Sequence, residues 1–158
     1  MINIKNRSYL FCVIICIIIQ ILGGLVTKSS IQDWYPTLNK PSFNPPNQVF
    51  PVVWTILYVM MGIAWGHINT IKKFNKLTSK QNLYFISQLM LNCSWSFVFF
   101  GAHAIGIALI NLIVLWVLLA TTIYYFFKAS KIAGWLLVPY FFWVSYACML
   151  NYTIWRLN

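Results

Sequence analysis

The chain has 158 residues, of which 61% are hydrophobic and only 8% are charged, and its formal net charge is +10. A soluble globular domain of this size needs a charged outer surface, which a single acidic residue, Asp33, and eleven basic residues cannot supply. The composition therefore excludes an ordinary soluble domain and indicates a membrane protein.

Five apolar runs are long enough to be transmembrane helices, because a helix needs about 20 apolar residues to cross about 30 Å of hydrocarbon. The sequence predicts helices at 9–26, 51–68, 83–100, 105–127 and 133–154. We therefore expect an all-α membrane protein, a five-transmembrane-helix bundle that forms a single domain over 1–158. The first run could instead be a cleaved signal peptide, because Lys5 and Arg7 precede it, but its length and the lack of an A-x-A site favour a retained helix.

The basic residues lie in short clusters between the apolar runs, which is typical of topology signals and not of a nucleic-acid-binding face. The larger group is Lys5, Arg7, Lys72, Lys73, Lys76, Lys80, Lys128 and Lys131, and the smaller group, at the other side, is Lys28, Lys40 and Arg156. By the positive-inside rule, we expect the N-terminus inside and the C-terminus outside. The expected location is a bacterial cytoplasmic membrane, with lipid and no nucleic acid as a partner.

The segment 27–50 connects the first two predicted helices and is rich in proline and aromatic residues after Trp34. Because proline fixes φ and lacks a backbone N–H group, this loop is predicted to be stiff and irregular. It could form a lid over the bundle. It could also merely join two helices at the membrane interface, with Trp34 and Tyr35 as anchors.

Three predicted helices carry aromatic and amide side chains at helical spacing, which places each set on one helix face. The sets are Trp54, Tyr58, Met61 and Trp65; Gln88, Asn92, Trp95, Ser96 and Phe99; and Tyr140, Trp143, Ala147 and Asn151. Amides facing lipid would lack hydrogen-bond partners, so we expect Gln88, Asn92 and Asn151 to point into the bundle. Converging aromatic faces predict a pocket for a flat, largely apolar ligand, although ordinary packing would give the same pattern.

Small residues recur at a spacing of four on two of the predicted helices. Gly62 and Gly66 form a GxxxG pair, and Ala102 and Gly106 repeat the spacing. Both pairs permit close contact between helices of one chain or of two chains, and the sequence leaves this choice open. Trp65, near the end of its helix, is interpreted as a membrane-interface residue.

Residues for acid–base or metal chemistry are scarce. The predicted spans contain no Asp, Glu, Lys or Arg, so coupling to ions through intramembrane charges is not expected. No carboxylate pair, Ser/His/Asp set or metal-ligand spacing occurs, and the four cysteines lie inside apolar runs. We therefore predict no metal site, no required cofactor and no firm catalytic residue.

A further group of motifs runs through the first loop and the second, third and fifth helices. They are Trp34-Tyr35, Lys40 to Phe43, Pro45-Pro46, Pro51 to Trp54, Gly62 to Trp65, Gln88, Leu91-Asn92, Trp95-Ser96, Pro139-Tyr140, Trp143 and Leu150 to Tyr152. Together they resemble the TspO/MBR family, which comprises the tryptophan-rich sensory proteins of bacteria and the mitochondrial translocator protein, or peripheral benzodiazepine receptor.

The resemblance implies a five-helix bundle, usually a homodimer, with a pocket that the first loop closes. It implies porphyrins such as protoporphyrin IX or haem as ligands, besides benzodiazepine-type compounds and, in animals, cholesterol. Trp54 and Trp143 correspond to the family's pocket tryptophans, with Tyr35, Asn92, Phe99 and Ala147 as further wall residues. The helical stripes add Tyr58, Trp95 and Tyr140 to the predicted ligand-binding set.

Three functions are compatible with these residues. The favoured one is a porphyrin-binding sensor, scavenger or carrier in tetrapyrrole and stress metabolism. The first alternative is an enzyme that breaks down protoporphyrin IX with light and oxygen, for which Trp54 and Trp143 are the candidate catalytic residues. The second is a transporter of a sterol or a small apolar ligand, because Leu150, Tyr152 and Arg156 fit a cholesterol-recognition pattern, although a Tyr and an Arg that anchor a helix end give the same pattern.

Overall fold

The computed structural model describes residues 4–71 and 80–158, where it contains five long helices and no strand. The helices are α1 (Ile4–Asp33), α2 (Val49–Ile71), α3 (Lys80–Ser96), α4 (Ile105–Ala129) and α5 (Lys131–Leu157). A short 3-10 turn, η1 (Tyr35–Thr37), follows α1, and a π-helical turn, η2 (Phe97–Gly101), extends α3. All five helices, with η2 counted as part of α3, are long and apolar enough to cross a membrane. The chain is a multi-pass integral membrane protein.

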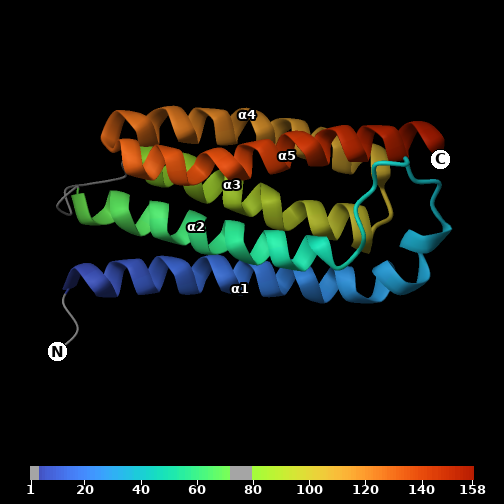
Figure 1. Ribbon diagram of the computed structural model, residues 1–158, viewed down its shortest axis with the longest axis horizontal. Coiled ribbons are helices and arrows are strands. Elements are labelled where there is room, and N and C mark those ends of the chain that lie inside the picture. Colours follow the sequence, from blue (N-terminus) through green and yellow to red (C-terminus); the bar gives the residue numbers. More distant parts are fainter. Residues whose placement is uncertain (1–3, 72–79) are drawn as a thin grey trace.

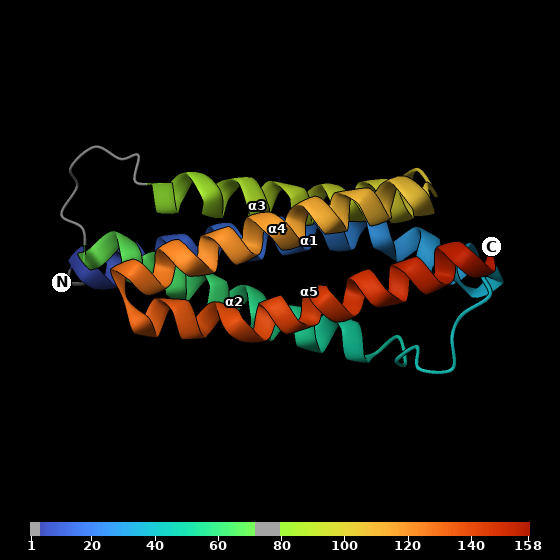
Figure 2. The same cartoon turned by 90° about the horizontal axis from the view of Figure 1, so that it is seen from above.

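The five helices lie side by side along one long axis, as Figures 1 and 2 show. Helix α1 packs against α2 and α3, α2 packs against α5, and α4 packs against α3 and α5. The order around the bundle is therefore α1, α2, α5, α4, α3. The connection between α1 and α2 passes beside the last turns of α5 (Figure 1), and we call this the loop end of the bundle.

The predicted basic groups separate between the two ends of the bundle. Lys28, Lys40 and Arg156 belong to the loop end, whereas Arg7, Lys80, Lys128 and Lys131 belong to the opposite end. Lys72, Lys73 and Lys76 of the larger group lie outside the described residues. The side of the membrane on which each end lies remains a prediction from these charges.

Helix α1 is longer than its apolar run. It continues past the predicted end at residue 26 to Asp33, so the segment between α1 and α2 is shorter than the predicted 27–50 loop. Thr27 Oγ1 donates to the carbonyl of Gly23 at 2.9 Å, and the amide of Trp34 donates to the carbonyl of Ser30 at 3.0 Å. Hydropathy marks the part of a helix inside hydrocarbon, and a helix with polar side chains can continue beyond it.

The GxxxG pair joins two helices of the same protomer. A Cβ atom at Gly62 would lie 2.5 Å from the Cα of Val13, and one at Gly66 would approach the α1 backbone to 2.8 Å. A Cβ at Gly106 of α4 would lie 3.0 Å from Nε1 of Trp155 in α5. These glycines therefore serve intramolecular packing, and the predicted homodimer would need other residues.

The amide side chains of α3 and α5 face the bundle interior as predicted. Gln88, Asn92 and Asn151 are 0%, 6% and 2% exposed, which confirms that these amides point inward. The interface assignment of Trp65 was wrong. Its ring is buried and stacks on Phe85 with centroids 4.9 Å apart, and its indole N–H donates to Asn82 Oδ1 at 2.9 Å. A position near a helix end does not determine which face of the helix a side chain occupies.

Candidate ligand-binding site

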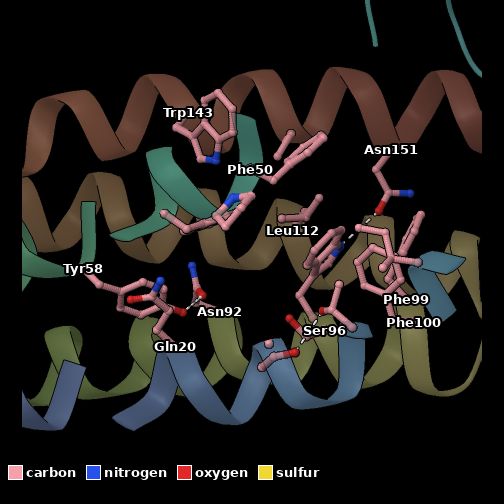
Figure 3. A pocket seen from close by; sticks show the side chains of 18 of the residues that line it. Gln20, Phe50, Tyr58, Asn92, Ser96, Phe99, Phe100, Leu112, Trp143 and Asn151 are labelled. Atoms are coloured by element: carbon pink, nitrogen blue, oxygen red, sulfur yellow. Dashed lines mark hydrogen bonds between the residues drawn. The ribbon is translucent and has the colours of Figure 1, made fainter. Parts of the chain in front are cut away.

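A cavity of about 710 Å³ lies in the half of the bundle nearest the loop end. All five helices line it, together with residues of the segment between α1 and α2. Figure 3 shows aromatic, aliphatic and amide side chains from different helices converging on it. The volume is within the range of about 300–1,000 Å³ that is usual for small-molecule sites.

Two tryptophans form one wall of the cavity. Trp54 of α2 and Trp143 of α5 have ring centroids 6.4 Å apart and planes at 88° to one another. Trp143 also packs against Phe50 and Tyr146, with centroid distances of 6.0 Å and 5.6 Å. Neither indole N–H of this pair has a hydrogen-bond acceptor within the described residues. The wall therefore offers indole faces and two unused donors to a ligand.

The opposite wall comes from the end of α3 and from η2. Trp95 and Phe99 stack with centroids 5.0 Å apart and an interplanar angle of 24°. Trp95 Nε1 donates to Asn151 Oδ1 at 3.1 Å, and Asn151 Nδ2 donates to the carbonyl of Ile105 at 3.0 Å. The wider π-helical turn buries both Phe99 and Phe100. The Asn151 amide of α5 thus fixes the position of the Trp95 ring of α3.

A network of two tyrosines and two amides forms the floor of the cavity. Tyr58 donates to Asn92 Oδ1 at 2.5 Å, Asn92 Nδ2 donates to the Tyr140 hydroxyl at 2.6 Å, and Tyr140 donates to Gln88 Oε1 at 3.1 Å. Tyr58 and Asn92 line the cavity, whereas Tyr140 and Gln88 lie behind them and are fully buried. Within the described residues, Gln88 Nε2 has no acceptor. The network holds the Asn92 amide in a fixed orientation at the cavity surface.

The segment after α1 closes the loop end of the cavity. Tyr35 is 5% exposed, and its hydroxyl donates to Asn44 Oδ1 at 2.7 Å. Lys40 Nζ donates to the Tyr35 carbonyl at 2.7 Å and lies 4.7 Å from the centroid of the Tyr35 ring. Burial raises the pKa of the Tyr35 hydroxyl to about 12, against the opposing effect of its bond to Asn44. The hydroxyl therefore remains a hydrogen-bond donor at neutral pH.

The same segment is attached to α5 by hydrogen bonds. The amide of Asn39 donates to Asn158 Oδ1 at 2.9 Å, and Asn158 Nδ2 donates to the Asn39 carbonyl at 3.1 Å. Tyr146 donates its hydroxyl to the carbonyl of Phe43 at 2.7 Å. These bonds hold the segment between α1 and α2 against the end of α5, and its Tyr35 and Asn47 line the cavity. That the segment acts as a lid stays a prediction.

The mouth of the cavity lies between α1 and the start of α2. The lining residues that are also exposed are Ile21, Gly24, Lys28, Asn47, Pro51 and Thr55. A Cβ atom at Gly24 would meet no atom within 4 Å, so the mouth is open at this position. Gln20 Nε2 donates to Thr55 Oγ1 at 2.7 Å across the two helices and bounds the mouth on its deeper side.

Most predicted ligand-binding residues lie at this cavity. Those that line it are Tyr35, Trp54, Tyr58, Asn92, Trp95, Phe99, Trp143 and Ala147. Tyr140 does not line the cavity and instead supports Asn92 from behind. The structure divides the sterol pattern, because Leu150 lines the cavity whereas Tyr152 is 48% exposed and Arg156 is exposed. Those three residues do not form one surface.

Sequence reasoning missed the contribution of α1. Gln20, Gly24 and Lys28 line the cavity at a spacing of four residues, which places them on one helix face. This spacing was the available signal. From the sequence, the first run is interpreted only as an apolar span that ends at residue 26, and Lys28 beyond it only as a topology signal.

Comparison with known proteins identifies the family of the chain. Residues 12–156 match the TspO/MBR family. The chain is 42% identical over 157 residues to the tryptophan-rich protein TspO of Chlorobaculum tepidum, with 99% of each chain covered. It is 37% identical over 126 residues to the tryptophan-rich sensory protein of Cereibacter sphaeroides, which covers 80% of this chain and 77% of the relative. It is also 37% identical over 128 residues to the human translocator protein, with 79% and 75% covered. The chain therefore belongs to the TspO/MBR family.

Proposed function

We propose that this protein binds a porphyrin, such as protoporphyrin IX or haem, in the cavity and acts as a sensor, scavenger or carrier in tetrapyrrole and stress metabolism. It would do so as a homodimer in a bacterial cytoplasmic membrane. The observation that carries the proposal is the wall formed by Trp54 and Trp143, whose rings line a cavity of about 710 Å³. Indole faces are favourable contacts for a flat, apolar macrocycle.

The names of the relatives support a ligand-responsive membrane protein in general terms. One relative is named a tryptophan-rich sensory protein and another a translocator protein. Neither name states a porphyrin, so the identity of the ligand rests on the cavity and on the family resemblance. The described cavity lining contains one charged residue, Lys28, which suits a ligand that is mostly apolar.

Titration with protoporphyrin IX in darkness tests the proposal. Full-length protein in uncharged detergent micelles should shift the porphyrin absorbance saturably, with one porphyrin bound per chain. Trp143→Ala should weaken binding. Trp116→Phe should not, because Trp116 lies outside the cavity lining, is 38% exposed and donates its N–H to Ser145 Oγ at 2.8 Å. Binding no stronger than to empty micelles would exclude a porphyrin function.

The proximity of two indoles to the ligand position favours a second candidate, the light-dependent breakdown of porphyrin. Indole is more easily oxidised than phenyl, and Trp54 and Trp143 are 6.4 Å apart at the same wall. The same dark-equilibrated sample can be illuminated in air. Conversion faster than for free porphyrin in empty micelles, lost in the Trp54→Phe and Trp143→Phe double variant with dark binding retained, would favour the enzyme. Equal conversion with and without protein would leave binding as the function.

A further inference from the structure

Lys28 has a distinct position among the charged residues at the loop end. It is the only charged side chain that lines the cavity within the described part of the chain, and it is exposed at the mouth. No hydrogen bond or ion pair joins its ammonium group to residues 4–71 or 80–158. Lys40, by contrast, donates to the carbonyls of Tyr35 and Pro36 at 2.7 Å and 3.4 Å.

No carboxylate of the cavity lining compensates the charge of Lys28. The single acidic residue of the sequence, Asp33, lies at the end of α1 and is not part of the lining. The hydroxyl of Thr55, across the mouth, already accepts from Gln20 and donates to the carbonyl of Pro51 at 2.8 Å. The negative charge that pairs with this ammonium group therefore has to come from outside the cavity lining, from a ligand or from lipid.

The surroundings of Lys28 separate a charged rim from an apolar interior. Four residues deeper on the same helix face, Gly24 has no side chain, and a Cβ there would meet no atom within 4 Å. Gln20 lies a further turn away, about 12 Å along the axis from Lys28 at 1.5 Å per residue. A carboxylate placed deeper, among the aromatic walls, would be desolvated without a cationic partner at a large energetic cost.

We infer that Lys28 is a specificity-determining residue, which selects flat apolar ligands that carry a carboxylate by pairing with that carboxylate at the mouth. The apolar body of the ligand then lies against Trp54 and Trp143, and its acidic edge remains near water. This inference rests on the proposed function, because it assumes that the cavity is the ligand site. It narrows the ligand class to planar acids and fixes their direction of insertion.

Two ligands that differ only in charge test the inference directly. Protoporphyrin IX and its dimethyl ester have the same macrocycle, but only the free acid carries carboxylates. Both would be titrated in darkness against full-length wild type, Lys28→Gln and Lys28→Arg in dodecyl maltoside. Arg156→Gln is the matched control, because it removes an exposed cation from the same end of the bundle without changing the cavity lining.

Lys28→Gln should weaken binding of the free acid about fivefold, the size expected for a solvent-exposed ion pair. Lys28→Arg should bind the acid within about twofold of wild type, and all variants should bind the ester alike. The preference for the acid should shrink in 1 M salt because exposed charges are screened. Equal losses for acid and ester would mean that Lys28 acts by packing, and no loss for either would also overturn the inference.

A second pair of probes separates this inference from the porphyrin proposal. Pyrenebutyrate and its methyl ester are flat, fluorescent and smaller than a porphyrin. Selection of pyrenebutyrate that depends on Lys28, without any porphyrin binding, would refute the porphyrin function and retain the inference. Binding of both probe pairs with no effect of Lys28→Gln would refute the inference alone, and binding of neither pair would refute both.

Lipid phosphate is the other anion that could occupy this position. The titrations would therefore be repeated in phosphatidylcholine nanodiscs, which carry phosphate near the mouth, as dodecyl maltoside does not. Acid selection that persists in nanodiscs assigns Lys28 to the ligand. Selection that is present in maltoside and absent in nanodiscs would assign the residue to lipid and overturn the inference.

Discussion

The substitution Gly62→Ala gives the sharpest test of how α1 and α2 pack. An alanine Cβ at this position would lie 2.5 Å from the Cα and 2.8 Å from the Cγ2 of Val13. Favourable carbon contacts lie at about 3.5–4.0 Å, so the α1 backbone would have to move away by about 1 Å. Overpacking of this kind costs about 1–3 kcal/mol, of which about 0.5–1 kcal/mol is offset by the better helix propensity of alanine. We expect a net loss of about 1 kcal/mol, within a range of about 0–2.5 kcal/mol.

Gly24→Ala provides the matched control on α1. The same methyl group at Gly24 would meet no atom within 4 Å, so only the gain in helix propensity should remain. The two Gly→Ala substitutions should therefore change the free energy of unfolding in opposite directions. The measurement is reversible unfolding in mixed micelles of dodecyl maltoside and increasing dodecyl sulfate, followed by far-ultraviolet circular dichroism.

The result also distinguishes the two roles that a GxxxG pair can have. Each unfolding series would be accompanied by the mass of the protein in the micelle, measured by light scattering. If Gly62→Ala lowered the oligomeric state and left the unfolding of the monomer unchanged, the pair would serve association between chains. Equal effects of Gly62→Ala and Gly24→Ala would equally contradict the close contact between α1 and α2.

Further outcomes follow from the cavity and its cover. Trp143→Phe should keep the affinity for protoporphyrin IX within about tenfold, or about 1.4 kcal/mol, because a ring face remains, whereas Trp143→Ala should lower the affinity further. Titration in darkness measures both affinities, and equal losses would mean that the ring is not a stacking surface. Asn92→Leu leaves the hydroxyls of Tyr58 and Tyr140 without this partner, so unfolding in mixed micelles should show a loss of about 2–4 kcal/mol, and a neutral result would contradict the network. Asn158→Ala removes both bonds to Asn39, so amide exchange in residues 38–48 should accelerate in mass spectrometry while the exchange of α2 stays unchanged. A reporter fused to the C-terminus should lie outside the cytoplasm, and cytoplasmic activity of that reporter would refute the predicted topology.

The transmembrane helices could be predicted from the sequence because hydropathy is a direct consequence of the lipid surroundings. The predicted run 105–127, for example, lies within α4, which begins at Ile105. The inward direction of Gln88, Asn92 and Asn151 could be predicted for the same reason, since an amide facing lipid lacks partners. The positions of the helices and the inward direction of the amides depend on the surrounding lipid and not on details of packing.

Other features depend on contacts between helices and could not be predicted. The residues 27–33 contain polar side chains and were interpreted as loop, yet they continue α1 and bring Lys28 to the cavity. Tyr140 lies on the same helix face as Trp143, but it does not reach the cavity because the Asn92 side chain lies between Tyr140 and the cavity. Helical spacing predicts the face of a side chain, whereas its distance from a cavity depends on the side chains of other helices. The π-helical turn of η2 has no marker in the sequence, and it determines how Phe99 and Phe100 are placed.

Because Gly62 and Gly66 lie against the backbone of α1, helices α1 and α2 are in close contact at one end and separated at the other. Near Val13 the two backbones are so close that they cannot slide apart without losing the contact, while near Gly24 they enclose open space. Lys28 is fifteen residues from Val13, which corresponds to a lever of about 22 Å along the helix, so a rotation of about 5° at the glycines displaces Lys28 by about 2 Å. The hydrogen bond from Ser30 Oγ to the carbonyl of Phe100 at 2.6 Å joins this part of α1 to η2, so it opposes such a rotation and holds the width of the mouth.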